Sequence, residues 1–235
     1  MVRTELPVVA VPELPDEPAL YAWTLLNAGY FETVAYSLED RVRSDQYRAN
    51  AARAELASTI RNVDDFLVSL EMVTTFSPFT KDSKARITQL INKTNQFNLT
   101  TIRYTEADIT EMMTDPNVVT MQVRLQDRFG DNGLIAVVIG RVRDGKEVLI
   151  DTWLMSCRVL GRKVEESIVK KLAEIAVEHG LKSLIGHYMP TDKNGMVKDL
   201  YGRLGFQRVD LEASGDFWRC GVADIDFGDL PFKID

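Results

Sequence analysis

The sequence is poor in cysteine and histidine, with two of each among its 235 residues. Cys157 and Cys220 cannot form a disulfide framework, which favours a reducing compartment, so we expect a cytoplasmic protein. His179 and His187 have no neighbouring residues at the spacing of metal ligands, and we therefore expect no metal site.

Long apolar runs and an excess of positive charge are also missing. No uncharged apolar run is long enough to span a bilayer, and the run from Val8 to Val11 is too short for a leader because Pro7 and Pro12 interrupt it. The formal net charge of −7 argues against a partner bound mainly through nucleic-acid phosphates. We expect neither a membrane nor a nucleic acid as partner, and the oligomeric state stays open.

A strand, a tight turn and a helix occupy the centre of the chain. The apolar run from Val148 to Met155 reads as a strand, and Gly161 lies in the turn after it. Apolar residues then recur at helical spacing from Val164 to Leu172. Because the first amides of a helix are unpaired and carry positive partial charge, this turn is suited to bind an anion.

Side chains in this turn point to anion binding and nucleophilic chemistry. Ser156, Arg158, Arg162 and Lys163 accompany the amides of the turn, and these cations would favour the thiolate form of Cys157. The alternatives are a turn that only connects two elements, and a cysteine that packs as a small hydrophobic residue.

The spacing of this turn resembles the pyrophosphate loop of the GNAT acyltransferases. That loop usually reads Gln/Arg-x-x-Gly-x-Gly/Ala, and here Arg158 and Gly161 match it while Lys163 occupies the last small position. The resemblance implies that coenzyme A or phosphopantetheine binds there, and Lys163 would either crowd the pyrophosphate or neutralise it.

A second constellation resembles the end of a GNAT domain. Asn194 is followed by Tyr201 and then by Leu-Gly-Phe206, and the resemblance implies that the Tyr201 hydroxyl protonates a leaving thiolate. The alternatives are a core tyrosine and a helix N-cap at Asn194. His187, expected in a nearby strand, is a candidate base or a structural residue.

These patterns predict an α/β (α+β) fold with a mixed, mostly antiparallel sheet flanked by helices. The segment that follows Asp224 reads as a tail. Thr105 is expected to cap a helix that runs to Met113. The other main elements are a strand at 72–78, a helix at 83–95, strands at 118–129, 134–143, 147–155 and 184–189, a helix at 196–204, and strands at 206–209 and 217–222.

The segment from Asn92 to Thr101 is rich in amide and hydroxyl side chains. It predicts either a polar junction, in which these groups bind the backbone, or an amide-lined site. We expect a domain boundary here, with domains at 1–97 and 98–235.

Nearly the whole chain resembles the FkbH-like proteins, subfamily IIIC of the haloacid dehalogenase superfamily. The resemblance lies in the motifs at 14–21, 45–50, 69–72, 89–101, 128–133, 150–161 and 190–194. It implies that residues 1–97 are the C-terminal part of a dehalogenase-like domain and that 98–235 form a GNAT-like domain. The Asp-x-Asp nucleophile strand and the acidic magnesium motif of that family are absent, so no phosphatase activity is expected.

The resemblance further implies transfer of a glyceryl or related acyl group to an acyl carrier protein in polyketide extender-unit biosynthesis. Cys157 would carry the acyl group, and Tyr201 and His187 would serve as acid and base. The other hypothesis is a non-catalytic domain that binds coenzyme A or docks a carrier protein.

Overall fold

The computed structural model describes residues 11–28, 38–211 and 213–234, and side chains from residue 47 within the second range. The chain forms two compact units, 1–48 and 49–235. In the first unit, η1 (Pro18–Leu20) leads into α2 (Tyr21–Asn27), which has no buried residue. The helix α3 (Leu38–Thr59) begins in the first unit and ends in the second. The apolar segment Leu6–Pro12, whose composition predicts a short strand, lies largely outside the described residues.

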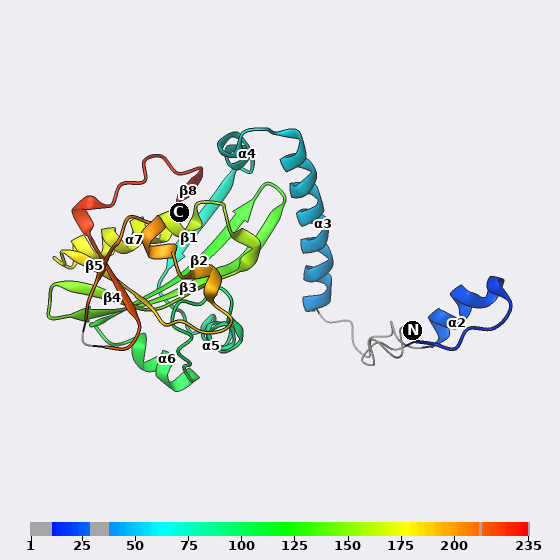
Figure 1. Cartoon of the computed structure of the whole chain (residues 1–235), viewed down its shortest axis with the longest axis horizontal. Helices are drawn as coiled ribbons and strands as arrows, with labels where there is room; N and C mark the ends of the chain where they lie inside the picture. The colour runs from blue at the N-terminus through cyan, green and yellow to red at the C-terminus, as the bar shows by residue number, and fades with distance from the viewer. Residues whose placement is uncertain (1–10, 29–37, 212, 235) are drawn as a thin grey trace. The chain divides into compact units, whose positions relative to one another are not determined.

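The second unit is built on one eight-stranded sheet in the order β6-β7-β5-β4-β3-β2-β1-β8, shown in Figure 1. Neighbouring strands are antiparallel except in the pairs β4–β5 and β1–β8, which confirms the predicted mixed, mostly antiparallel sheet. The strands are β1 (Met72–Ser77), β2 (Val118–Asp127), β3 (Gly130–Arg143), β4 (Glu147–Met155), β5 (Ser183–Tyr188), β6 (Gln207–Val209), β7 (Asp216–Gly221) and β8 (Phe232–Ile234).

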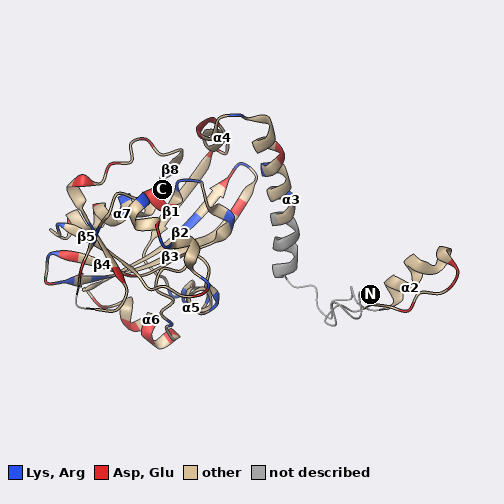
Figure 2. Ribbon diagram, in the orientation of Figure 1, with Lys and Arg blue, Asp and Glu red and all other residues tan. Residues whose placement is uncertain are grey.

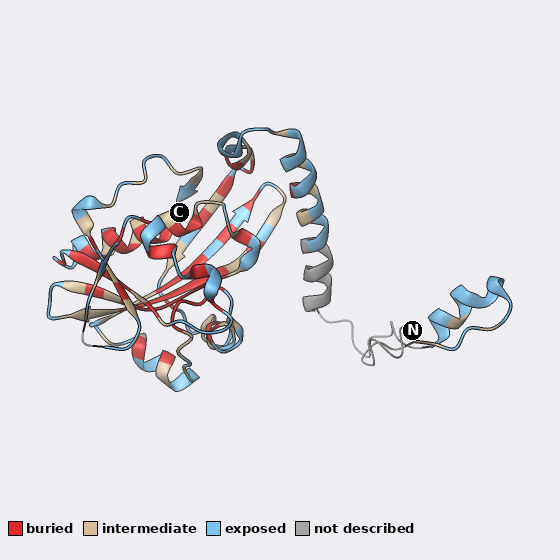
Figure 3. Ribbon diagram, in the orientation of Figure 1, coloured by how far each residue is buried: buried red, intermediate tan, exposed pale blue. Residues whose placement is uncertain are grey.

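Helices cover both faces of this sheet. The helices of the second unit are α4 (Val63–Ser69), α5 (Lys84–Lys93), α6 (Glu106–Met112), α7 (Val164–Glu178) and α8 (Leu200–Arg203), with short 3-10 turns η2 (Cys157–Val159), η3 (Gly195–Val197) and η4 (Val222–Asp224). Successive strand residues alternate between two cores, since Val138 packs with α4, α7 and α8 whereas Val137 and Ile139 pack with α5 and α6. Figure 3 shows the buried residues concentrated in the central strands.

Acidic residues begin several of these helices. Asp64 and Asp65 lie in the first turn of α4, and Glu106 and Asp108 in that of α6, where Figure 2 shows red segments. Carboxylates at this end stabilise a helix because they face its unpaired amides. Thr105 and Asp108 form a capping box, which confirms the predicted cap of α6.

Two strands separate at their carboxyl ends, and a loop fills the gap. β4 and β5 pair only from Glu147 to Ile150 and from Ser183 to Gly186. Beyond this point, the amide of Leu99 donates to the carbonyl of Trp153, at 3.0 Å, and the amide of Met189 donates to the carbonyl of Leu99, at 2.8 Å. The backbone around Leu99 therefore replaces the missing strand pairing.

Residues 49–97 belong to the same folded unit as the segment that follows them. β1 pairs with β2, and Phe97 and Leu99 lie in one core with Trp153. The sheet thus includes a strand from the part that the resemblance assigns to a dehalogenase-like domain. The predicted tail contains β8, which pairs in parallel with β1, so the expectation of a plain tail is wrong.

A buried carboxylate joins α3 to the sheet. Asp127 at the end of β2 accepts hydrogen bonds from Arg53 Nε at 2.7 Å, Arg53 Nη2 at 2.8 Å and Arg162 Nη1 at 3.1 Å. Asn132 Nδ2 and the amide of Phe129 also donate to it. Burial acts to raise the pKa of Asp127, but these hydrogen bonds and the Arg53 charge outweigh burial and hold the pKa below its usual value.

We expect Asp127→Asn to lower the free energy of unfolding at neutral pH by about 3–5 kcal/mol, because two arginines would lose their buried counter-charge. Urea unfolding measures this loss. Since the folded-state pKa is depressed, the contribution of Asp127 is complete above its unfolded pKa of about 3.9 and is lost as the pH falls through the folded value. The difference between the wild type and the variant should therefore shrink in acid.

Asp131→Asn is the matched control. Asp131 lies near Asp127 in sequence and pairs with Arg124 at 3.0 Å, but both side chains are more than half exposed. Its loss should cost about 0–1 kcal/mol. Equal costs for the two variants would contradict the anchoring role of Asp127.

Candidate functional site

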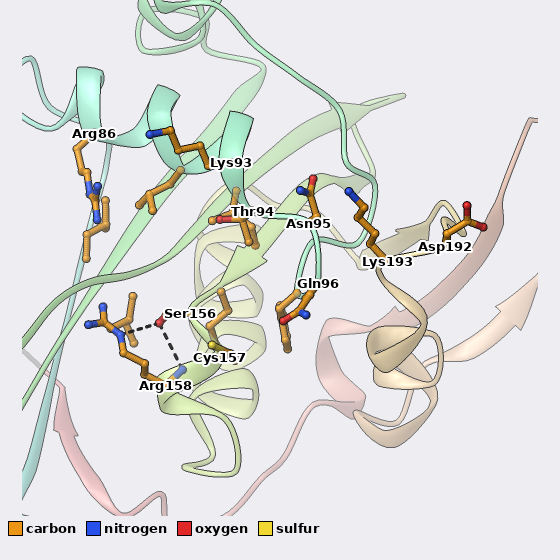
Figure 4. A pocket seen from close by; sticks show the side chains of 16 residues that line it. Arg86, Lys93, Thr94, Asn95, Gln96, Ser156, Cys157, Arg158, Asp192 and Lys193 are labelled. Carbon is orange, nitrogen blue, oxygen red and sulfur yellow. Dashed lines mark hydrogen bonds between the residues drawn. The ribbon is translucent and has the colours of Figure 1, made fainter. Parts of the chain in front are cut away.

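A cavity of about 700 Å³ lies where β4 ends, and we call it the Cys157 cavity (Figure 4). Its apolar wall comes from α5, β3, β4 and Phe97, and its polar lining comes from loops on either side. The lining residues are Arg86, Leu90, Lys93, Thr94, Asn95, Gln96, Phe97, Leu134, Ile135, Leu154, Met155, Ser156, Cys157, Arg158, Asp192 and Lys193. This size and mixed lining are typical of a small-molecule site.

Cys157 is exposed in this cavity and begins the turn η2. Ser156 precedes it, and the Ser156 hydroxyl accepts from the Arg158 amide at 3.4 Å and from Arg158 Nε at 3.2 Å. The amide of Ser156 donates to the carbonyl of Ile135 at 2.7 Å. The turn is thereby held to the sheet, and Figure 4 shows the Cys157 and Arg158 side chains leaving it in different directions.

Positive charge is concentrated around the thiol. The cavity lining contains four cationic side chains, Arg86, Lys93, Arg158 and Lys193, and one carboxylate, Asp192. In Figure 4 Arg86 and Arg158 lie on one side of Cys157 and Lys193 on the other. In a chain with a net charge of −7, this local excess of cations would attract an anionic ligand.

The structure divides the predicted anion-binding turn between two places. Gly161 and Lys163 line a separate cavity of about 140 Å³, together with Glu165, Glu166 and Arg203. Lys163 Nζ forms an ion pair with Asp64 at 2.7 Å. Gly161 and Lys163 both have left-handed backbone, with φ of 74° and 60°.

The chain's own carboxylates lie at the start of α7, where an anion was predicted to bind. Glu165 is buried in the first turn of that helix, and burial raises its pKa, while a hydrogen bond with its own amide acts in the opposite direction. The positive end of the helix dipole therefore faces two acidic side chains, Glu165 and Glu166. An incoming anion would meet these carboxylates as well as the amides.

Two further predicted ligand-binding residues have structural partners. Arg162 is bound to Asp127, and burial together with the charge of Arg53 lowers the pKa of Arg162. Asn194 is fully buried, and its Nδ2 donates to the carbonyls of Asn98 and Met189, both at 2.9 Å. Asn194 sits at the N-cap position of η3, yet its side chain makes no capping bond to that turn.

Asn98 shows why the amide-rich segment folds as it does. Its buried Nδ2 donates to the carbonyl of Thr94, and its Oδ1 accepts from the amide of Thr101 at 2.9 Å. These bonds support the interpretation as a polar junction. Asn95 and Gln96 of the same segment line the Cys157 cavity, so the two alternatives apply to different residues.

The predicted acid and base lie outside the Cys157 cavity lining. Tyr201 is fully buried against Trp153, and a methyl group at Gly186 would lie 2.4 Å from its ring. Burial raises the pKa of Tyr201. His187 stacks on Phe217 with ring centroids 4.4 Å apart, and its Nε2 is 3.0 Å from the carbonyl of Ser214.

The structure thus brings together Ser156, Cys157 and Arg158, and it adds residues that the sequence analysis missed. Arg86, Leu90 and Lys93 line the cavity from α5, at spacings of four and three residues. This spacing places them on one helix face, so the sequence alone could have predicted that they lie together. Among the described residues, no group of three or more histidine, cysteine or acidic side chains could hold a metal ion. No described helix is long and apolar enough to cross a membrane.

No protein-family model and no curated protein matches the chain. Solved structures with a similar fold include the GNAT domain of PAT from S. lividans, which is 16% identical, with 62% of this chain and 89% of that chain covered and a TM-score of 0.48. An aminoglycoside acetyltransferase in complex with coenzyme A is 18% identical, with 63% and 94% covered and a TM-score of 0.47.

A spermidine N-acetyltransferase from Vibrio cholerae, in complex with coenzyme A and spermine, is 11% identical. There 65% of this chain and 97% of that chain are covered, with a TM-score of 0.46. At these identities and scores the likeness extends to the fold alone.

We expect Asn194→Ala to lower the free energy of unfolding by about 2–4 kcal/mol. The reason is that the buried carbonyl of Asn98 and the partly buried carbonyl of Met189 would each lose a donor. A fully buried group left unpaired costs roughly 1–3 kcal/mol, and a partly buried one costs less. Chemical denaturation measures the change. Asn92→Ala is the control, because Asn92 also donates to two carbonyls, those of Thr88 and Tyr104, but from an exposed position. A cost for Asn92→Ala as large as that for Asn194→Ala would show that burial is not the cause.

Proposed function

We propose that the chain is an acyltransferase that accepts an acyl group from a phosphopantetheine thioester and holds it on Cys157. The supporting observation is the exposed Cys157 thiol in a cavity of about 700 Å³ that four cationic side chains line. A cavity of this kind fits a pantetheine arm in its apolar part and a phosphate near the cations.

The chemistry is a thiol–thioester exchange. The Cys157 thiolate attacks the carbonyl carbon of the donor, the carbon–sulfur bond to pantetheine breaks, and the pantetheine thiolate leaves and takes up a proton. One thioester replaces another, so this step needs no external energy source. In a second step a nucleophile of the acceptor attacks the Cys157 thioester and restores the free thiol.

Stabilisation of the developing oxyanion falls to groups around the thiol. Arg158 contributes positive charge, and the amides of Asn95 and Gln96 contribute hydrogen-bond donors from the opposite wall. Because Tyr201 and His187 do not line the cavity, we propose that protons exchange with solvent through its mouth. In this proposal Tyr201 and His187 support the fold around β5 and do not contact the substrate.

The resemblance to the FkbH-like proteins supports a finer form of this proposal. In that form the acyl group is glyceryl or a related group, the acceptor is an acyl carrier protein, and the product serves polyketide extender-unit biosynthesis. The cations of the Cys157 cavity would then meet the phosphate of the carrier's prosthetic arm.

A second candidate is a non-catalytic module that binds coenzyme A or docks a carrier protein. Two observations favour it. The backbone around Leu99 fills the gap between β4 and β5, and Gly161 and Lys163 open to a different cavity from Cys157. Such a module would bind the phosphopantetheine ligand without forming a covalent intermediate.

Covalent loading separates the two candidates. Incubation with a panel of acyl thioesters should add one acyl mass to the wild-type chain, and peptide mapping should place it on Cys157. Cys157→Ala should show no adduct. Cys220→Ala is the matched control and should be loaded like the wild type, because Cys220 is buried in β7. Saturable binding with no adduct on any donor would favour the non-catalytic module.

Calorimetry with coenzyme A tests whether its phosphates bind in the Cys157 cavity or at the start of α7. We expect Lys93→Gln to weaken binding by about three- to tenfold, because a phosphate would lose one cation and tenfold corresponds to about 1.4 kcal/mol. Lys163→Gln should change the dissociation constant much less. Greater weakening by Lys163→Gln would move the anion from the Cys157 cavity to the start of α7.

A further inference from the structure

A chain of hydrogen bonds runs from Arg53 on α3 to the carbonyl of Arg158, the residue after Cys157. Arg53 on α3 donates twice to Asp127, and Arg162 Nη1 donates to the same carboxylate at 3.1 Å. Arg162 Nη2 then donates to the carbonyl of Arg158, also at 3.1 Å. We call Arg53, Asp127, Arg162 and the Arg158 carbonyl the arginine relay.

The relay is enclosed by protein around Asp127, whereas its last bond, from Arg162 Nη2 to the carbonyl of Arg158, is exposed. The side chains of Arg53, Asp127 and Arg162 have relative exposures of 8%, 0% and 11%. Asp127 accepts from five donors in all, since Asn132 and the amide of Phe129 complete its shell. A planar guanidinium that bridges two acceptors fixes their separation. Around Asp127, low exposure leaves little water to replace a lost partner.

The end of the relay lies beside the proposed nucleophile. The carbonyl of Arg158 belongs to the residue directly after Cys157, and the amide and Nε of Arg158 both bind the Ser156 hydroxyl. The Arg158 residue is therefore held from its amide side by Ser156 and from its carbonyl side by Arg162. A shift of the Arg162 side chain would move the Arg158 backbone and, with it, the Arg158 cation that shares the cavity with the thiol.

We propose that Arg53 is a positioning residue for Cys157, acting through the arginine relay to set where the Arg158 cation lies relative to the thiol. The inference rests on the proposed function only in taking Cys157 as the reacting group. It makes the geometry of the cavity depend on the packing of α3, a helix that no residue of the cavity lining belongs to.

Alkylation of Cys157 tests the relay without any acyl donor. In a Cys220→Ala background one thiol remains, and it displaces iodide from either anionic iodoacetate or neutral iodoacetamide. The ratio of the two rates reports the positive charge near the sulfur. We expect Arg53→Met to lower this ratio about threefold or more, the effect of couplings carried by contacting networks. Arg53→Lys should give an intermediate ratio, because it keeps the positive charge but loses the bidentate contact with Asp127.

Two variants are controls, and a third tests the path itself. Arg124→Met removes an exposed arginine from β2, and Leu184→Ala destabilises the core on β5, so both should leave the ratio unchanged. Arg162→Met should lower the ratio as Arg53→Met does, and the double variant should show no further fall, since both act through one path.

Either of two results would overturn the relay. The first is an unchanged ratio in Arg53→Lys and in folded Arg53→Met, and the second is an equal fall in Leu184→Ala. If the ratio depends on Arg53 while no acyl adduct ever forms on Cys157, the positioning role stands and the proposed function fails.

Discussion

The carboxylate of Asp127 is the constraint on which the rest of the second unit depends. Removing two guanidinium groups and a carboxylate from water is costly, and five hydrogen bonds to one carboxylate offset that cost only if every partner is in place. This requirement fixes the turn of α3 that carries Arg53, the end of β2 and the turn before α7 relative to one another. That turn follows Cys157 directly. In the proposed relay, the geometry of the site therefore depends on the buried cluster of Arg53, Asp127 and Arg162.

The site differs from a helix-terminus anion site in where its positive charge originates. At the start of α7, the amides face Glu165 and Glu166, and the nearby Lys163 is paired with Asp64. At the end of β4, by contrast, cations from α5, η2 and the loop after β5 line the same cavity as the Cys157 thiol. The turn that resembles a pyrophosphate loop is therefore divided, since Arg158 lines the Cys157 cavity whereas Gly161 and Lys163 line another.

Local patterns in the sequence predicted most of the sheet and helices. The strand at 147–155 has the predicted limits, and Thr105 caps α6 as expected, because both depend on neighbouring residues. The strand β8 could not be predicted, since its pairing with β1 joins segments far apart in the chain. Residues predicted as one helix at 196–204 form η3 and α8 instead.

The same division between local and distant interactions explains the candidate site. The sequence correctly placed Ser156, Cys157 and Arg158 at a strand end. It could not show that Arg162 would bind Asp127 or that Asn194 would bind the backbone of Asn98, because those partners lie 35 and 96 residues away. Nor could it show that the Leu99 backbone would fill the gap between β4 and β5.

The central claim is that a phosphopantetheine ligand occupies the Cys157 cavity. Amide hydrogen exchange with and without saturating coenzyme A tests this claim most directly. The account predicts slower exchange at residues 94–97 and 156–158, with little change at 161–166. Protection confined to 161–166, or no protection anywhere at saturation, would contradict it.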